Sequence, residues 1–185
     1  NHIEEIEVDS PERKIIFKKS VSENGVTIES NDLISNISES KTWSLNKIIG
    51  EHVYVENSET KSKNYELVIA WNDELNDKEN VIFSYFKTQV RFPFPALLHG
   101  TFELTQNRNQ LENDTYGHNQ FLTDKLTDLL IDTALKIASK EEEATYLPLK
   151  LLNIDFEKID KELINFNFEE KLIKKIKSNA IFPTV

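Results

Sequence analysis

Short runs of β-branched and aromatic residues, separated by polar turns, fill the first hundred positions. Two of these runs, 64–72 and 81–86, are almost continuously apolar, which is typical of strands covered on both faces. We expect them to be antiparallel neighbours joined by a polar loop, with 101–105 as a third strand. Asn24-Gly25, with apolar residues on both sides, predicts a further hairpin earlier in the chain.

The pattern changes after Arg91. The sequence Phe92-Pro93-Phe94-Pro95 excludes a helix and a central strand, because Pro has no N–H and restricts the residue before it. Beyond an Asn-rich polar loop, apolar residues recur at three- and four-residue steps and predict one continuous helix over 118–139. The stripe that we expect to pack on the sheet includes Leu122, Leu126, Leu129 and Ile137.

Shorter apolar patterns follow and predict three helices, over 147–154, 156–164 and 168–176. Pro148 marks a boundary between an α+β module, residues 1–147, and a helical C-terminal extension, residues 148–185, packed on the same core. The predicted fold class is α+β: a mixed or mainly antiparallel sheet with a long helix packed on it, followed by a short helical C-terminal region.

Composition narrows the function classes. The 185 residues carry 22 Lys and Arg against 32 Asp and Glu, a net charge of −10, which argues against nucleic-acid binding. With no Cys there is no disulfide, thiolate zinc site or Cys nucleophile, and the four His lie far apart in sequence. No apolar run approaches the roughly 20 residues of a membrane helix. We expect a cytoplasmic protein with no nucleic-acid or membrane partner.

The segment from Val81 to Leu111 carries the most informative motifs. They are, in order, Tyr85-Phe86-Lys87-Thr88, Pro93 and Pro95, His99-Gly100-Thr101-Phe102, and Asn107-Arg108-Asn109. This order resembles the segment after the nucleotide domain of sacsin-like ATPases, relatives of the 90-kDa heat-shock chaperones in the GHKL superfamily. Lys87 stands where that family usually has Pro. Trp43 and the opening residues 1–8 resemble flanking features of the same family.

The resemblance covers about 1–140 and is dense over 81–111. It implies the middle module of a GHKL-type ATPase or chaperone, docked on an N-terminal nucleotide domain of the same polypeptide, with a protein client as a further possible partner. In that family the catalytic Glu and the Mg-binding Asn lie in the nucleotide domain, and no matching motif occurs here. ATP and Mg²⁺ are therefore expected in the parent protein, with no cofactor, metal site or ATPase activity in this chain alone.

The resemblance also implies a catalytic role for Arg108. The middle domain of the chaperone relatives lends one Arg to the γ-phosphate of ATP, from a loop that follows a strand. Arg108 has this setting, between the predicted strand 101–105 and Leu111. Phosphoryl transfer needs positive charge where negative charge grows, and Arg supplies it with fixed planar donors. The alternative is a solvated loop Arg, or one that caps the long helix through Asp114.

Four neighbours are weaker candidates for phosphate contact: Asn107, Asn109, Gln110 and His99. For both Asn residues the alternative is turn formation through side-chain hydrogen bonds to nearby backbone. For His99 the alternative is a half-buried ring that orders the Pro-rich segment, since nothing nearby in sequence would orient it as a base. Gly100 is expected to adopt a backbone conformation that a side chain would forbid.

A second function class remains open. In it the chain is a non-catalytic protein-interaction or scaffold module, with Phe92-Pro93-Phe94-Pro95 as an exposed aromatic contact loop. A free-standing enzyme is disfavoured, because no nucleophile–base pair, metal cluster or phosphate-binding loop is visible. The opening Asn1-His2-Ile3 and the apolar final residues lead us to expect a piece of a longer protein.

Overall fold

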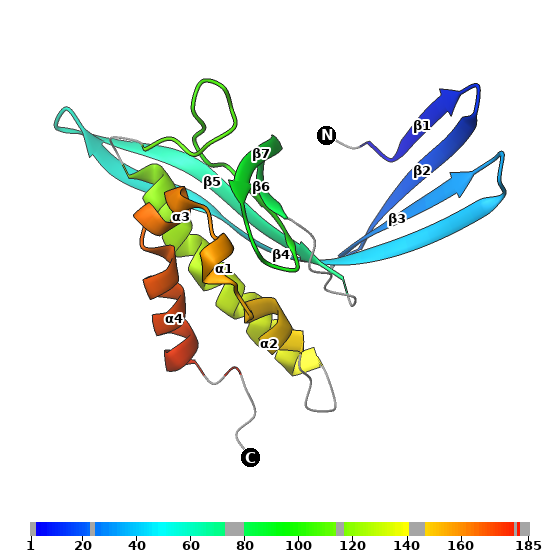
Figure 1. Cartoon of the computed structure of the whole chain (residues 1–185). Coiled ribbons are helices and arrows are strands. Elements are labelled where there is room, and N and C mark those ends of the chain that lie inside the picture. Colours follow the sequence, from blue (N-terminus) through cyan, green and yellow to red (C-terminus); the bar gives the residue numbers. More distant parts are fainter. Residues whose placement is uncertain are drawn as a thin grey trace, which may run out of the picture. The chain divides into compact units, whose positions relative to one another are not determined.

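The computed structural model describes residues 3–22, 25–72, 80–113, 117–140, 147–179 and 181. The chain is α+β, as predicted, with a mixed, mostly antiparallel sheet of eight strands in the order β1-β2-β3-β4-β5-β8-β6-β7 (Figure 1). The chain divides into two compact units. The meander unit comprises 1–45 with 70–73, and the helix unit comprises 46–69 with 74–185.

The meander unit is a single antiparallel layer (Figure 1). Its strands are β1 (Glu5–Ser10), β2 (Arg13–Ser22), β3 (Gly25–Asp32) and the first part of β4 (Ile37–Glu56). The predicted hairpin is confirmed, because Ser22 pairs with Gly25 across a turn whose residues lie outside the described ones. Gly25 is required there, since an added Cβ would lie 2.5 Å from the Trp43 carbonyl oxygen.

In the helix unit, β4 continues to Glu56 and is followed after a two-residue turn by β5 (Glu59–Trp71). Asn57 and Ser58 have φ values of 50° and 67°, the left-handed pair that a type I′ hairpin turn requires. The strand predicted over 64–72 is therefore confirmed, and it begins five residues earlier than the apolar pattern indicated.

Two predictions about the sheet are wrong. The run 81–86 is not one strand, because it divides at Tyr85 (φ 59°) into β6 (Val81–Ser84) and β7 (Phe86–Arg91). Nor is β6 a neighbour of β5, since β8 (Leu97–Gly100) lies between them and pairs parallel to β6. The Pro-containing segment after β7 brings the chain back to insert β8, whose Leu98 is fully buried. Most of the polar loop before β6 lies outside the described residues.

The predicted strand 101–105 is also wrong. Beyond β8, the described residues make one isolated bridge, between Leu104 and Leu111. The physical reason is that a side chain takes the place of a strand partner: the Asn119 amide bonds both the N–H and the C=O of Glu103.

The Pro-rich segment is part of the core, so the predicted exposed contact loop is wrong. Phe92 is 0% exposed and Phe94 is 1% exposed. Their rings stack with centroids 4.3 Å apart, and the Phe94 ring meets the edge of Phe168 at 5.9 Å. Asn80 donates to the Phe94 carbonyl oxygen at 2.6 Å, which satisfies backbone that Pro95 leaves without a strand partner.

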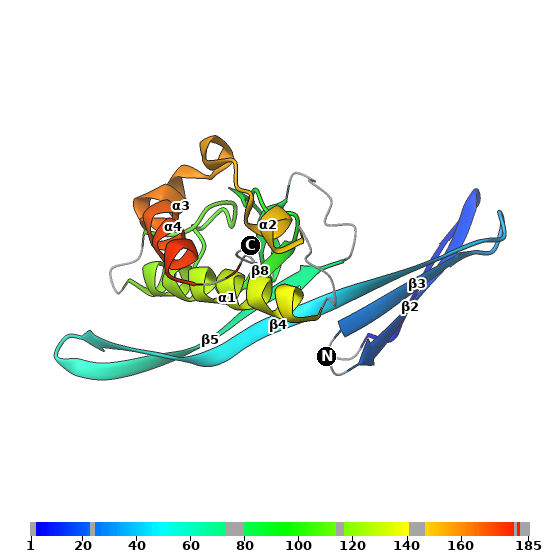
Figure 2. The same cartoon turned by 90° about the horizontal axis from the view of Figure 1, so that it is seen from below.

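The long helix is confirmed as α1 (His118–Lys140), and it lies along β4 and β5 (Figure 2). Its buried stripe contains the predicted Leu122, Leu126, Leu129 and Ile137, together with Leu130 and Ala134. Asn46 of β4 fixes the helix on the sheet. Its amide donates to Asp132 and Thr133, each at 2.9 Å, and accepts from Lys136 at 2.7 Å.

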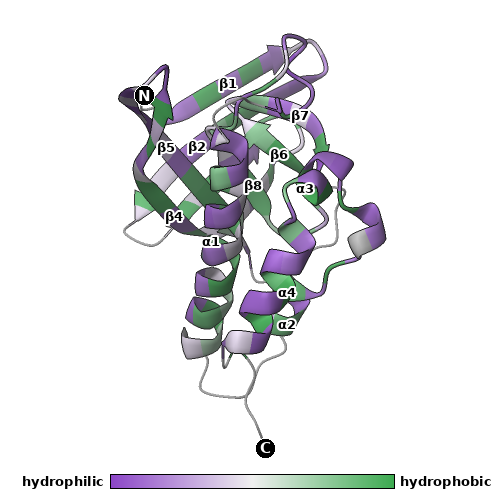
Figure 3. Ribbon diagram, turned by 90° about the vertical axis from the view of Figure 1, so that its left-hand side faces the viewer, coloured by the Kyte–Doolittle hydropathy of each residue, from purple (hydrophilic) through white to green (hydrophobic). Residues whose placement is uncertain are grey.

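Of the C-terminal helices, α2 and α4 pack on α1 and α3 packs on α4, and hydrophobic and hydrophilic residues alternate along them (Figure 3). They are α2 (Leu147–Leu152), the 3₁₀ turn η1 (Phe156–Lys158), α3 (Lys161–Asn165) and α4 (Phe168–Ser178). The helix predicted over 156–164 is interrupted, because Asp160 is extended and its carboxylate caps α3 through the Glu162 N–H. Lys171 and Lys175 tie α4 to Asp124 and Asp128 of α1. Among the described helices, none is long and apolar enough to span a membrane.

Candidate functional site

The loop that carries Arg108 leaves the sheet at Thr101 and returns toward α1. Thr101 donates its N–H to the Glu66 carbonyl of β5, and its hydroxyl accepts from the Glu66 N–H, both at 3.1 Å. Farther along, the Glu112 N–H donates to the Glu103 carbonyl at 2.9 Å. The two arms of the loop are therefore held side by side at its base.

Asn119, in the first turn of α1, fastens this base. Its side chain is fully buried and makes three hydrogen bonds to the backbone of both arms. Its oxygen accepts from the Glu103 N–H at 2.8 Å, and its nitrogen donates to the carbonyls of Glu103 (2.8 Å) and Glu112 (2.7 Å). The position of the loop is thus set by the end of a core helix.

The tip of the loop is a compact turn that includes three of the predicted site residues. The Arg108 N–H donates to the Thr105 carbonyl at 2.7 Å, and Arg108 itself lies at φ 58°. The Asn107 side-chain oxygen accepts from the Asn109 N–H at 3.1 Å, which is the local turn bond proposed as the alternative role for Asn107. Asn109 in turn accepts from the Gln89 N–H at 2.8 Å, which joins the tip to β7.

The guanidinium of Arg108 lies over the ring of Phe86, with its carbon 5.6 Å from the ring centroid. Both side chains are exposed, Phe86 to 61%. No carboxylate pairs with Arg108 among the residues that the structure describes, and Asp114 lies outside them. Arg108 is thus a positive charge that an aromatic face holds in place and that no described acid neutralises.

Among the described residues, neither Gln110 nor His99 hydrogen-bonds to the Arg108 guanidinium. Gln110 has an exposed side chain, and its carbonyl accepts from the Thr105 N–H at 3.0 Å. His99 is half-buried on β8, and its ring meets the edge of Tyr85 at 5.5 Å. Tyr85 is 76% exposed at a left-handed φ, which is uncommon for an aromatic residue. The expectation for Gly100 is wrong, because it has no left-handed φ and serves to leave room for Phe102 and Leu67.

Three residues at this site had no role assigned from the sequence. Tyr85 and Phe86 were part of a motif, but nothing in the sequence places Phe86 under Arg108, 22 residues later. Asn119 is a polar residue at the start of an apolar stripe, and its three backbone partners are known only from the structure. An Asn in the first turn of the helix predicted over 118–139 is the one signal in the sequence that points to this role.

A second polar cluster joins two His that lie far apart in sequence. The Nδ1 atoms of His52 and His118 are 3.1 Å apart, and the Phe121 ring stacks on His52 at 4.2 Å. Burial, followed by the nearby Lys63, lowers the pKa of His118 below its usual value of 6.5. Both rings are buried, and no group of three potential metal ligands occurs among the described residues.

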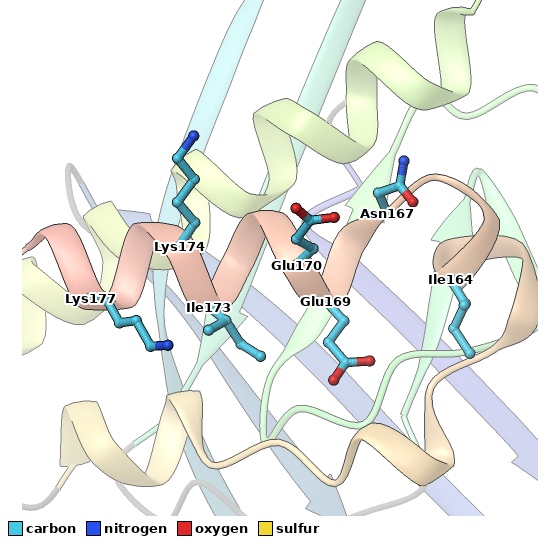
Figure 4. A pocket seen from close by; sticks show the side chains of 7 residues that line it. All are labelled: Ile164, Asn167, Glu169, Glu170, Ile173, Lys174 and Lys177. Atoms are coloured by element: carbon cyan, nitrogen blue, oxygen red, sulfur yellow. The ribbon is translucent and has the colours of Figure 1, made fainter.

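A surface hollow lies along α3 and α4, away from the Arg108 loop. Figure 4 shows its lining, which consists of Ile164, Asn167, Glu169, Glu170, Ile173, Lys174 and Lys177. Two carboxylates and two ammonium groups share this surface, so it favours neither an anionic nor a cationic ligand. It contains none of the predicted site residues.

No protein-family model, curated protein or solved structure matches this chain.

Proposed function

We propose that this chain is the middle module of a GHKL-type ATPase or molecular chaperone, similar to sacsin and the 90-kDa heat-shock proteins. In this proposal it docks on an N-terminal nucleotide domain of the same polypeptide and supplies Arg108 to the γ-phosphate of ATP. ATP and Mg²⁺ are bound mostly by that other domain, so this chain alone turns over no ATP.

The observation that carries the proposal is the state of the Arg108 side chain. An arginine that acts on a nucleotide in another domain has to be exposed, free of an internal carboxylate and held on a rigid support. Arg108 is exposed and has no described acidic partner, and Asn119 anchors its loop to α1. A solvated loop arginine needs no such anchor.

The contact with Phe86 fits a residue that changes partner during a reaction cycle. A cation–π contact at an exposed site contributes only about 0.5–1 kcal/mol, so leaving the ring costs little. A charged phosphate in a closed, water-poor site offers a much stronger partner. The left-handed φ of Arg108 is a local strain of the kind that gathers at functional loops.

The test is ATP turnover by the protein that contains this chain and its nucleotide domain. We expect Arg108→Ala to lower kcat on the order of 10³-fold with little change in ATP affinity, because the contact forms mainly in the closed, reacting state. Arg108→Lys should recover little, since an ammonium lacks the planar fork of donors. Arg91→Ala is the matched control, an exposed arginine at the other end of the strand that begins with Phe86, and it should be nearly neutral.

Equal turnover by wild type and Arg108→Ala would reduce Arg108 to a loop residue. Absence of any ATP turnover by the parent would instead favour the second function class, a non-catalytic interaction or scaffold module. The exposed contact loop predicted for such a module is absent at Phe92 and Phe94, because both side chains are buried.

A further inference from the structure

The meander unit has one apolar face and one polar face. In its antiparallel register, alternate residues of the four strands point to the same side. One face, here called the apolar face, contains Ile6, Val8, Ile15, Phe17, Val21, Val26, Ile28, Ile37 and Trp43. The opposite face is built of Ser, Thr, Asn and charged residues, with Ile16 as its one large apolar side chain within the paired strands.

The apolar face does not form a core. Within the described residues 3–22 and 25–45, no large apolar side chain is buried. Val21 is 68% exposed, Ile37 is 58% exposed and Ile6 is 50% exposed. A single sheet with one apolar face is stable only when that face is covered by another layer, so this surface calls for a partner.

The charges of the two faces differ in sign. The apolar face carries three cations and two anions in its paired strands: Arg13, Lys19, Lys41, Asp32 and Glu39. The polar face carries four anions and two cations: Glu5, Glu7, Asp9, Glu29, Lys14 and Lys18. In a chain of net charge −10, the apolar face is therefore the side that a second acidic copy approaches with least repulsion.

The residues of β4 make this face complementary to itself. Ile37, Glu39, Lys41 and Trp43 alternate along the strand on the apolar side. A two-fold axis that crosses the strands between Glu39 and Lys41 places each Glu39 opposite Lys41 of the second copy. The same axis places Ile37 opposite Trp43 of the second copy. On β2 it matches Ile15 with Val21 of the second copy, whereas on β3 it places Val26 opposite Asp32 of the second copy.

We propose that a second copy of this chain packs on the apolar face, forming a two-layer β-sandwich about this two-fold axis. Four strands about 4.8 Å apart and about eight residues long cover roughly 500 Å² per copy, or about 1,000 Å² in total. An area of about 1,000 Å² is at the small end of specific interfaces, which fits a reversible dimer. An isologous contact of this kind closes on itself and does not propagate into fibres.

The test is a charge-reversal cycle followed by sedimentation velocity over a wide range of protein concentration. Wild type is expected to dimerise as the concentration rises. Glu39→Lys or Lys41→Glu alone places like charges opposite each other at the axis, and each should weaken the dimer by roughly tenfold. The double variant restores opposite charges across the axis, and its dissociation constant should return to within about threefold of wild type.

The matched control is Glu29→Lys, the same charge change on the polar face, which should leave dimerisation unchanged. Far-ultraviolet circular dichroism and the unfolding midpoint establish that each variant is folded. The proposal is overturned if wild type stays monomeric at every concentration. A dimer that the double variant fails to restore equally excludes this axis.

Discussion

Asn119 is the residue on which the geometry of the Arg108 loop depends most. Its amide bonds one N–H and two carbonyls of the loop and is fully buried, so no water is available to replace it. We expect Asn119→Asp to lower the free energy of unfolding by about 2–4 kcal/mol, because a carboxylate keeps the acceptor and turns two donated bonds into repulsive contacts. Urea unfolding measures this loss.

Hydrogen exchange measures the effect of the substitution on the loop itself. The amides of Glu103 and Glu112 should lose protection in Asn119→Asp, while those in the middle of α1 stay protected until global unfolding. Asn153→Asp, an exposed position between α2 and η1, is the control and should change stability by less than about 0.5 kcal/mol. Unchanged protection of Glu103 would contradict the anchoring role of Asn119.

Glu162 makes the free energy of unfolding decrease as the pH rises. Burial, followed by the neighbouring Asp160, raises the pKa of Glu162 from 4.5 to about 7. Between these values the folded state holds a proton that the unfolded state releases, so stability falls as the pH rises through this window. Glu162→Gln removes the effect. In urea unfolding, the free energy of unfolding of Glu162→Gln minus that of wild type should be larger at about pH 8 than at about pH 5.

His118 has the opposite effect on the pH dependence of stability, and its contribution has to be distinguished from that of Glu162. Its pKa is lowered by burial, so below pH 6.5 the unfolded state binds more protons and the folded state loses stability. The comparison of Glu162→Gln with wild type cancels this effect, because both proteins contain His118. Glu170→Gln, an exposed change on α4, is the control. A constant difference between Glu162→Gln and wild type across the pH range would contradict the assignment.

At the scale of the element, α1 joins the sheet to the C-terminal helices. Leu129 lies in the middle of its stripe and is fully buried. Leu129→Ala should lower the free energy of unfolding by about 2–5 kcal/mol, through lost burial and the cavity left behind. Leu149→Ala on α2, at a side chain 47% exposed, should cost less than about 1 kcal/mol. Equal losses of unfolding free energy in the two variants, measured by urea unfolding, would mean that the buried stripe of α1 is misassigned.

At the scale of the whole molecule, the proposal that another domain binds ATP leads to a prediction about the isolated chain. It should neither hydrolyse ATP nor bind it tightly, because the residues that hold ATP and Mg²⁺ are proposed to lie in another domain. The measurements are a phosphate-release assay and titration calorimetry. Saturable, magnesium-dependent ATP binding would contradict the proposal.

The sequence by itself predicted the elements whose signals are local. The apolar stripe of 118–139 predicts α1 to within one residue, because side chains three and four positions apart meet on one helix face wherever the helix lies. The apolar run of 64–72 likewise predicts the buried half of β5. Arg108 was singled out from a resemblance between motifs, which needs no coordinates.

The tertiary structure decided the features that depend on distant residues. It placed β8 between β5 and β6, since strand order follows from which chain segments can bury each other and not from the local pattern. It put Phe92 and Phe94 in the core, because the edge contact with Phe168 comes from a helix more than 70 residues away. The contacts between Phe86 and Arg108 and between His52 and His118 also join residues that are far apart in sequence. Propensity and periodicity reach a few residues along the chain, whereas packing and hydrogen bonding act across space.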